Sequence, residues 1–273
     1  MTWPLPYPQI DPAIVAIGPL AIRWYALSYI AGIVLAWMLL RRTIAASPAV
    51  GTPEQADEFM TWATLGVVLG GRVGYVLFYE LFFQTDRLFS SPLHIFAIWQ
   101  GGMSFHGGML GVFLATYLFT RRHKMALWAF GDRLVPGVPF GLLFGRLANF
   151  INAELWGRQA GPDVPWAMIF PTDPLQIPRH PSQLYQALLE GVCLLAILLP
   201  LSRSAAIRAR TGTLTGVFFI GYAVARIVGE MFRQPDAFLG FLFAGTTMGQ
   251  LLSVPMALFG AWLIWRAPRT KAA

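Results

Sequence analysis

Seven apolar runs, each long enough to cross a lipid bilayer, alternate along the chain with short charged or Pro/Gly-rich segments. A helix that spans the hydrocarbon core needs about 20 mostly apolar residues. The runs lie at about 16–40, 59–83, 103–120, 134–153, 182–201, 213–232 and 246–265. This pattern predicts an all-α polytopic membrane protein with seven transmembrane helices, which form a single domain over residues 1–273.

The lysines and arginines between these runs predict the orientation of the chain. They cluster after the first span, between the third and fourth spans, between the fifth and sixth spans, and at the end of the chain: Arg41, Arg42, Arg121, Arg122, Lys124, Arg133, Arg203, Arg208, Arg210, Arg266, Arg269 and Lys271. If the spans alternate in direction, all these clusters lie on one side. Short cytoplasmic loops are enriched in Lys and Arg, so we expect the N-terminus outside and the C-terminus inside.

Composition agrees with a membrane protein and narrows the functions to be considered. Hydrophobic residues make up 56% of the 273 residues and charged residues only 12%, about half the charged fraction of a soluble domain. The net charge of +7 comes from short clusters between apolar runs and not from one continuous basic surface, so we expect no binding of nucleic acid. Cys193 is the single cysteine, which excludes a disulfide framework.

Two segments between the spans are long enough to form structures of their own. Residues 154–181, rich in proline and aromatic residues, are expected to form a small cap on the outer, periplasmic side. Residues 84–100 contain Ile95, Phe96 and Trp99 and are expected to lie along the interface as an amphipathic arm.

Arginines that orientation signals cannot explain indicate an anion site. Eight cations lie within spans or on the outer side: Arg23, Arg72, Arg87, Arg146, Arg158, Arg179, Arg226 and Arg233. Charge at membrane depth is costly and marks function by default, and Arg binds phosphate through two N–H groups at once. In the sixth span, residues spaced four, four and three apart form one polar face: Tyr222, Arg226, Glu230 and Arg233. Arg146, Asn149 and Asn152 share a face of the fourth span, so the two faces are expected to form an anionic-ligand pocket.

Each candidate also has a structural interpretation. A single Arg226–Glu230 pair serves equally well to lock helices together, but three arginines with one or two glutamates leave unpaired positive charge, which favours a ligand. His106, near the outer start of the third span, suits proton transfer at neutral pH, with packing an equally good interpretation. Arg72 is interpreted as the partner of Glu80, and the Gly pairs at 70 and 107 as sites of close helix packing. No cluster has metal-ligand spacing, so we expect no metal and no cofactor.

Several motifs, in order, resemble one known family. They are GGRVGYVLFYE, FHGG at 105–108, GRLANFINAELWG at 145–157, RHPSQLYQ at 179–186, GYAVARIVGEMFRQPD at 221–236 and the late MGQLLSVPM. Together they closely resemble prolipoprotein diacylglyceryl transferase of the bacterial plasma membrane, and the resemblance covers essentially the whole chain. Ala148 and Ala153 stand in the central motif where many members have Gly.

The resemblance implies a transfer of the diacylglyceryl group of phosphatidylglycerol to the thiol of a lipobox cysteine in a prolipoprotein signal peptide. Glycerol phosphate leaves and a thioether remains, at a site toward the periplasmic leaflet of the inner membrane. Family roles make Arg146 and Arg226 phosphatidylglycerol-binding and catalytic residues. The other positions that match residues important to activity or site structure are His106, Tyr25, Asn149, Glu154, Tyr222, Glu230 and Arg233.

A physical hypothesis accompanies these assignments. A thiol with a pKa of about 8.5 must lose its proton to become a good nucleophile. Arg146 and Arg226 are expected to hold the lipid phosphate, His106 to take the thiol proton, and Glu154 and Glu230 to orient the arginines.

Two other functions stay open at this stage. A transporter or flippase of an anionic lipid-like substrate would also place arginines in a membrane cavity, but it predicts internal symmetry and interrupted helices, which the sequence does not show. A metal-dependent phosphatidyl transferase would need clustered aspartates, whereas the aspartates of this chain are scattered in loops.

Overall fold

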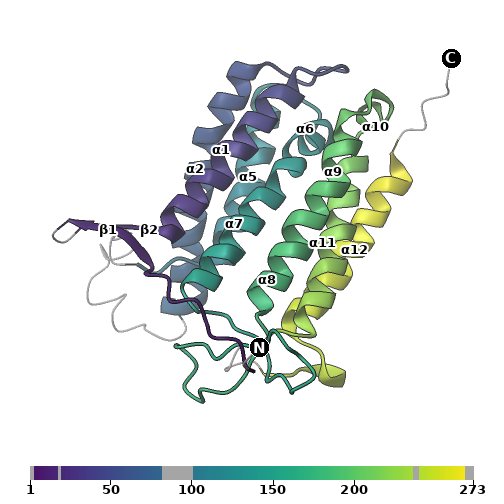
Figure 1. Ribbon diagram of the computed structural model, residues 1–273. Coiled ribbons are helices and arrows are strands. Elements are labelled where there is room, and N and C mark those ends of the chain that lie inside the picture. The colour runs from purple at the N-terminus through teal and green to yellow at the C-terminus, as the bar shows by residue number, and fades with distance from the viewer. Residues whose placement is uncertain (1–2, 18–19, 82–100, 236–239, 268–273) are drawn as a thin grey trace. The chain divides into compact units, whose positions relative to one another are not determined.

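The protein consists mainly of helices, with one short hairpin and several irregular segments, as a computed structural model shows for residues 3–17, 20–81, 101–235 and 240–267 (Figure 1). The hairpin pairs β1 (Ala13–Ile17) with β2 (Leu20–Arg23) in antiparallel orientation. The predicted interfacial arm, residues 84–100, lies outside the described residues. By its contacts, the chain divides into one unit of Met1–Thr43 with Gly131–Ala273 and a second of Ile44–Phe130.

Six helices in the described part of the chain are long and apolar enough to cross a membrane. They are Trp24–Ile44, Pro53–Phe78, Leu127–Ile151, Ser182–Arg203, Thr213–Glu230 and Met248–Arg266. This confirms a polytopic membrane protein. The remaining predicted span, at about 103–120, coincides with a helix of 18 residues, α5 (Phe105–Arg122), which is not one of the six. The predicted start of the first span near residue 16 is wrong, because Ala13–Ile17 and Leu20–Arg23 are strands and the helix begins at Trp24.

The unit Ile44–Phe130 is built on two helices in close contact, α2 (Pro53–Tyr75) and α5, which lie side by side in Figure 1. The side chain of Thr52 accepts a hydrogen bond from the Gln55 amide and begins α2 in a capping box. A Cβ on Gly70 would lie 2.4 Å from the carbonyl oxygen of Gly107, so only glycine permits this approach. The predicted packing role of the two Gly pairs is therefore confirmed. α2 continues as the π-helical η1 (Val76–Glu80).

The other unit contains most of the helices, which run in chain order from α1 (Trp24–Ile44). They are α6 (Leu127–Leu134), whose first residues belong to the other unit, η4 (Val135–Gly137), α7 (Val138–Ile151), α8 (Ser182–Gln186), η5 (Ala187–Cys193), α9 (Leu194–Arg203), α10 (Ala205–Ala209), α11 (Thr213–Glu230), η6 (Phe243–Gly245) and α12 (Met248–Arg266). Buried Leu194, Leu198, Leu214 and Phe218 pack α9 against α11. These apolar contacts fix the helices that carry the polar residues described below.

Both α11 and α12 begin at well-defined caps. The carboxylate of Asp132 accepts hydrogen bonds of 2.7 Å from the backbone amides of Gly212 and Thr215, at the start of α11. Its negative charge lies at the positive end of the helix dipole, which stabilises the first turn. Thr247 and Gln250 form a capping box that begins α12. α12 lies along α11 in Figure 1.

The helix over residues 182–203 changes its winding in the middle. Its first five residues form α8, the next seven form the π-helical η5, and α9 completes it. π-helical turns are rare and are frequently found at functional sites. In this helix the π-helical turn carries Glu190, whose side chain is fully buried.

Candidate active site

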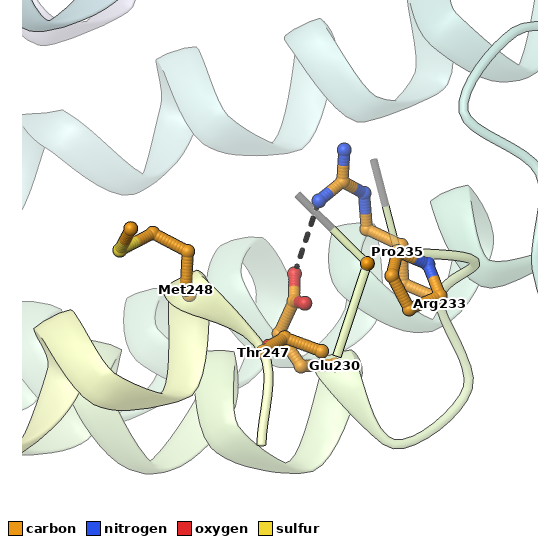
Figure 2. Close-up of a pocket in the computed structure, with 7 residues that line it drawn as sticks. Glu230, Arg233, Pro235, Thr247 and Met248 are labelled. Carbon is orange, nitrogen blue, oxygen red and sulfur yellow. Dashed lines mark hydrogen bonds and ion pairs between the residues drawn. The ribbon is translucent and has the colours of Figure 1, made fainter. Parts of the chain in front are cut away.

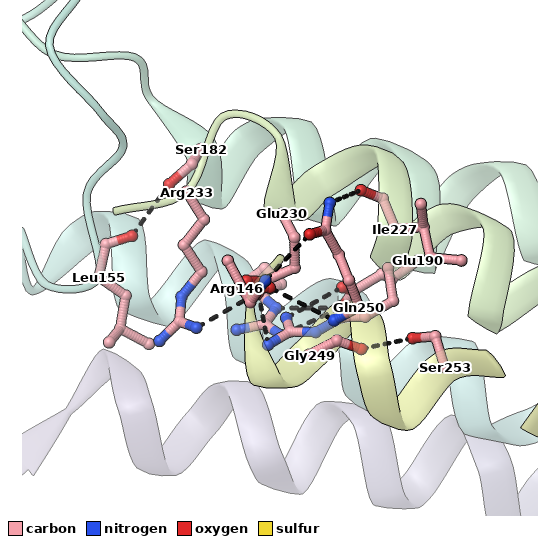
Figure 3. Close-up of polar contacts among 12 residues, drawn as sticks. Arg146, Leu155, Ser182, Glu190, Ile227, Glu230, Arg233, Gly249, Gln250 and Ser253 are labelled. Atoms are coloured by element: carbon pink, nitrogen blue, oxygen red, sulfur yellow. Dashed lines mark hydrogen bonds and ion pairs between the residues drawn. The ribbon is translucent and has the colours of Figure 1, made fainter. Parts of the chain in front are cut away.

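Two arginines from different helices meet on one buried carboxylate. Nε and Nη2 of Arg146, on α7, both lie 3.1 Å from Oε2 of Glu190, and Nη1 of Arg226, on α11, lies 3.4 Å from Oε1 of the same carboxylate. Figure 3 labels Arg146 and Glu190 within this group of polar contacts. The structure thus brings together the predicted arginines of the fourth and sixth spans.

A second buried carboxylate extends the cluster along α11. Oε1 of Glu230 lies 2.8 Å from Nη2 of Arg226, one helical turn before it, and 3.3 Å from Nη1 of Arg233. The predicted polar face of this helix is therefore present as a chain of ion pairs. The side chain of Glu230 is only 1% exposed. Arg226 therefore pairs with two buried carboxylates, those of Glu190 and Glu230.

The cluster retains an excess of positive charge. Three arginines, at positions 146, 226 and 233, share two carboxylates. The arginine side chains are 11–17% exposed, whereas both carboxylates are buried. A guanidinium has five N–H donors, so Arg146 and Arg226 keep donors beyond those used in these pairs. The arrangement can bind an anion such as a phosphate, with the glutamates holding the arginines in place behind it.

The predicted residues Asn149 and Glu154 contact each other at the end of α7. Nδ2 of Asn149 donates a 2.7 Å hydrogen bond to Oε1 of Glu154. Ala153 and Leu155, on either side of Glu154, have positive φ of 56° and 57°, which turns the chain sharply here. A left-handed conformation costs a residue with a side chain about 1 kcal/mol, so glycine is the natural choice at the position of Ala153.

The motif at 179–186 holds this turn from the other side. Oγ of Ser182 donates to the carbonyl oxygen of Leu155 at 3.0 Å, as Figure 3 shows, and Nε2 of Gln183 donates to that of Glu154 at 2.7 Å. Both Ser182 and Gln183 are fully buried. This motif therefore fixes the backbone that carries Glu154.

Two predicted tyrosines lie on the same unit. Tyr25, the second residue of α1, has its hydroxyl 3.2 Å from that of Tyr29 and also interacts with Asn149 and Glu154. Tyr222 precedes Arg226 by one turn of α11 and interacts electrostatically with Glu190 and Arg226. The structure thus places Tyr25 at the Asn149–Glu154 pair and Tyr222 at the arginine cluster.

His106 belongs to the other unit, Ile44–Phe130. It is the second residue of α5, and its side chain is exposed. Ser104 caps this helix, accepting a 3.2 Å hydrogen bond from the amide of Gly107. The role of His106 as proton acceptor stays a prediction.

The segment 154–181 is irregular and contacts the end of α11. Arg158 donates from Nη2 to the carbonyl oxygen of Glu230 at 3.0 Å and from Nε to that of Arg233 at 3.1 Å. Arginine near a helix C-terminus satisfies carbonyl groups that have no partner within the helix. Arg158 thus supports the backbone of two site residues.

An ion pair holds this segment together. Arg179 makes a fork of 2.8 and 3.1 Å with the carboxylate of Asp173, and its guanidinium lies 4.2 Å from the ring centre of Trp156. Burial alone would raise the pKa of Asp173, but the hydrogen bonds from Arg179 and from the Leu175 amide outweigh it and lower that pKa. Burial also lowers the pKa of His180.

A small hollow, with a cavity volume of about 20 Å³, lies beside the cluster between the end of α11 and the start of α12 (Figure 2). Its lining consists of Glu230, Arg233, Pro235, Gly240, Thr247, Met248 and Gly249. The Arg233–Glu230 ion pair forms one wall, as the dashed line in Figure 2 marks. A hollow of this volume has room for about one water molecule next to the Arg233–Glu230 ion pair.

Comparison with known proteins assigns the family. The family model described as prolipoprotein diacylglyceryl transferase matches residues 12–266. The chain belongs to the prolipoprotein diacylglyceryl transferase family. Among its relatives, each named phosphatidylglycerol–prolipoprotein diacylglyceryl transferase, the protein of Gluconobacter oxydans is 55% identical over 272 residues, which cover all of this chain and 98% of the relative. The protein of Azospirillum brasilense is 54% identical over 98% of both chains, and that of Paramagnetospirillum magneticum is 54% identical over the full length of both.

The structure of this transferase family member corrects one expectation and adds one residue. Glu154 was expected to orient the arginines, but it accepts a hydrogen bond from Asn149, and Glu190 binds both Arg146 and Arg226. Sequence reasoning missed Glu190 as a functional residue. The available signal was a single acidic residue in the apolar run LLEGVCLLAILL, because an isolated charge at membrane depth needs a partner.

Proposed function

We propose that this protein transfers the diacylglyceryl group of phosphatidylglycerol to the lipobox cysteine of prolipoproteins, the first step of lipoprotein maturation. The thiolate sulfur attacks the glycerol carbon that bears the phosphodiester oxygen. A C–S bond forms, the C–O bond breaks, and glycerol phosphate leaves with the electron pair. The single observation that carries this proposal is the convergence of Arg146 and Arg226, from two helices, on one buried position in a member of this family.

The arginine cluster supplies binding and transition-state stabilisation. The phosphate of phosphatidylglycerol binds between Arg146 and Arg226, on donors that Glu190 leaves available. Negative charge increases on the glycerol phosphate as the C–O bond breaks, and the guanidinium groups, already oriented by Glu190 and Glu230, stabilise it. Arg233 and Tyr222 complete this side of the substrate site.

The remaining roles in this proposal go to other residues of the chain. His106 accepts the thiol proton, since a neutral imidazole is a suitable base near pH 7. Asn149, Glu154 and Tyr25 form a hydrogen-bonded group at the end of α7 that positions substrate. The reaction requires no metal or cofactor.

We further propose that the chain lies in the bacterial inner membrane with seven spans; the six apolar helices support this, and α5 is the proposed seventh span. The N-terminus lies outside and the C-terminus inside, since the clusters of Lys and Arg then face the cytoplasm. Residues 154–181 form a periplasmic cap, and the site opens toward the outer leaflet, where secreted precursors are accessible.

Mass spectrometry of the acceptor peptide tests the proposal. Purified protein, phosphatidylglycerol and a lipobox peptide are incubated with EDTA, and the peptide should gain the mass of one diacylglyceryl group on its cysteine. A peptide with Cys→Ser, or phosphatidylcholine as lipid, should give no product. A lipobox peptide that stays unmodified under conditions where the protein remains folded would overturn the proposal.

A further inference from the structure

Gly249, in the first turn of α12, lies directly against the ion pair of Arg226 and Glu230. A Cβ built on Gly249 would be 2.9 Å from Cδ of Glu230, 3.1 Å from its Cγ, and 3.1 Å from Nε of Arg226. Carbon atoms in contact prefer about 3.5–4.0 Å. Figure 3 draws Gly249 beside this cluster. Any side chain here would displace the pair.

The start of α12 is held in this position by several contacts. The capping box of Thr247 and Gln250 fixes its first turn, and Nε2 of Gln250 donates to the carbonyl oxygen of Ile227 on α11 at 3.4 Å. Farther along, Gly216 and Gly260 bring the two helices together, since a Cβ on Gly260 would lie 2.7 Å from the Gly216 carbonyl oxygen. α12 therefore cannot retreat from the ion pair without losing contacts at both places.

We propose that Gly249 is a positioning residue for the transfer reaction, because its missing side chain lets the Arg226–Glu230 pair keep the orientation that binds the lipid phosphate. The inference rests on the proposed function. The atoms nearest to Gly249 are the ends of flexible side chains, which can move aside without disturbing the backbone. An added methyl group should therefore change the direction of the Arg226 guanidinium while the fold is retained.

Two other glycines in the same unit provide matched controls. At Gly260 an added Cβ would lie 2.7 Å from the backbone carbonyl oxygen of Gly216, which cannot move aside as a flexible side chain can, so Gly260→Ala should force the helices apart and lower stability. At Gly141, inside α7, an added Cβ has no atom within 4 Å, so Gly141→Ala should be neutral. The three substitutions add the same methyl group with three different consequences.

The test measures transfer kinetics and the melting temperature of Gly249→Ala beside both controls. We expect kcat/KM to fall about tenfold or more, since a misplacement approaching 1 Å costs on the order of a hundredfold. The KM for phosphatidylglycerol should rise while the KM for the peptide stays constant, and the melting temperature should stay that of the wild type. Glu230→Asp shortens the side chain that Gly249 contacts. Because both substitutions act on the same ion pair, the double variant Gly249→Ala/Glu230→Asp should have a kcat/KM little below that of Glu230→Asp alone.

The results separate this inference from the proposed function. Wild-type protein that makes no adduct refutes the proposed function itself. If the wild type is active and Gly249→Ala is equally active, only the positioning role is refuted. The positioning role is also refuted if Gly249→Ala loses activity but its melting temperature falls as far as that of Gly260→Ala.

Discussion

Replacing Glu190 with glutamine removes the charge that holds two arginines together and leaves the shape of the side chain unchanged. The carboxylate accepts hydrogen bonds of 3.1, 3.1 and 3.4 Å from Arg146 and Arg226 and is fully buried. In Glu190→Gln the amide oxygen can serve one guanidinium, but the amide NH₂ then faces the other, donor against donor.

The magnitude follows from these contacts. A hydrogen bond to a charged group contributes about 1.5–3 kcal/mol, and breaking a buried ion pair from one side costs about 3–5 kcal/mol. We therefore expect Glu190→Gln to lower the free energy of unfolding by about 3 kcal/mol. If the same loss reaches the transition state, through misdirected guanidinium groups, kcat/KM falls about a hundredfold, at 1.36 kcal/mol for each factor of ten.

The assay is diacylglyceryl transfer to a lipobox peptide, with the melting temperature measured on the same preparations. Glu190→Gln should lower both quantities. Glu58→Gln is the matched control, because Glu58 is 39% exposed and pairs with Arg122 and His123 near the surface, where solvent screens an ion pair and its contribution to stability is small. Wild-type kcat/KM and melting temperature in Glu190→Gln would refute the account of the arginine pair.

Three further predictions concern other residues. Arg146→Lys keeps the charge but loses the planar fork, so turnover should fall at least tenfold, and undiminished turnover would exclude bidentate phosphate binding. His106→Gln and His106→Asn should lower the rate at neutral pH and remove an ionisation from the pH profile; a full rate with the wild-type profile would exclude His106 as the base. The lowered pKa of Asp173 means that its ion pair with Arg179 stabilises the folded protein above the ordinary pKa of aspartate, about 3.9, and is lost as the pH falls through the lower folded value. Protection of the amides of residues 154–181 against hydrogen exchange, relative to the intrinsic exchange rate at each pH, should therefore fall in acid, and Asp173→Asn should already show lower protection at neutral pH; equal protection in both proteins at neutral pH would contradict this.

Much of the fold could be predicted because hydropathy and helical spacing are local properties of the chain. The six spanning helices follow from runs of apolar residues. The polar face of α11 follows from the intervals between Tyr222, Arg226, Glu230 and Arg233. The hairpin was missed because its residues AIVAI and LAIR are as apolar as those of a span, and hydropathy alone does not separate a short strand from the start of a helix.

The choice of carboxylate partner could not be predicted from spacing. Glu154, Glu190 and Glu230 were all available to the arginines, and which ones meet them depends on how separate helices face each other. The π-helical turn of η5 adds to the difficulty, because it changes the face on which Glu190 emerges from an otherwise α-helical segment. The contact of Gly249 with the ion pair likewise depends on the packing of α12 against α11, which no local pattern records.

The central claim is that Arg146 and Arg226 share the phosphate of one phosphatidylglycerol molecule. Solid-state NMR can measure it directly, as ¹⁵N–³¹P dipolar dephasing between labelled arginine side chains and one equivalent of the lipid in phosphatidylcholine bilayers. The account predicts strong dephasing, for N–P separations of about 4 Å, reduced in Arg146→Lys and in Arg226→Lys. Dephasing that is absent in the wild type, or unchanged by both substitutions, would contradict it.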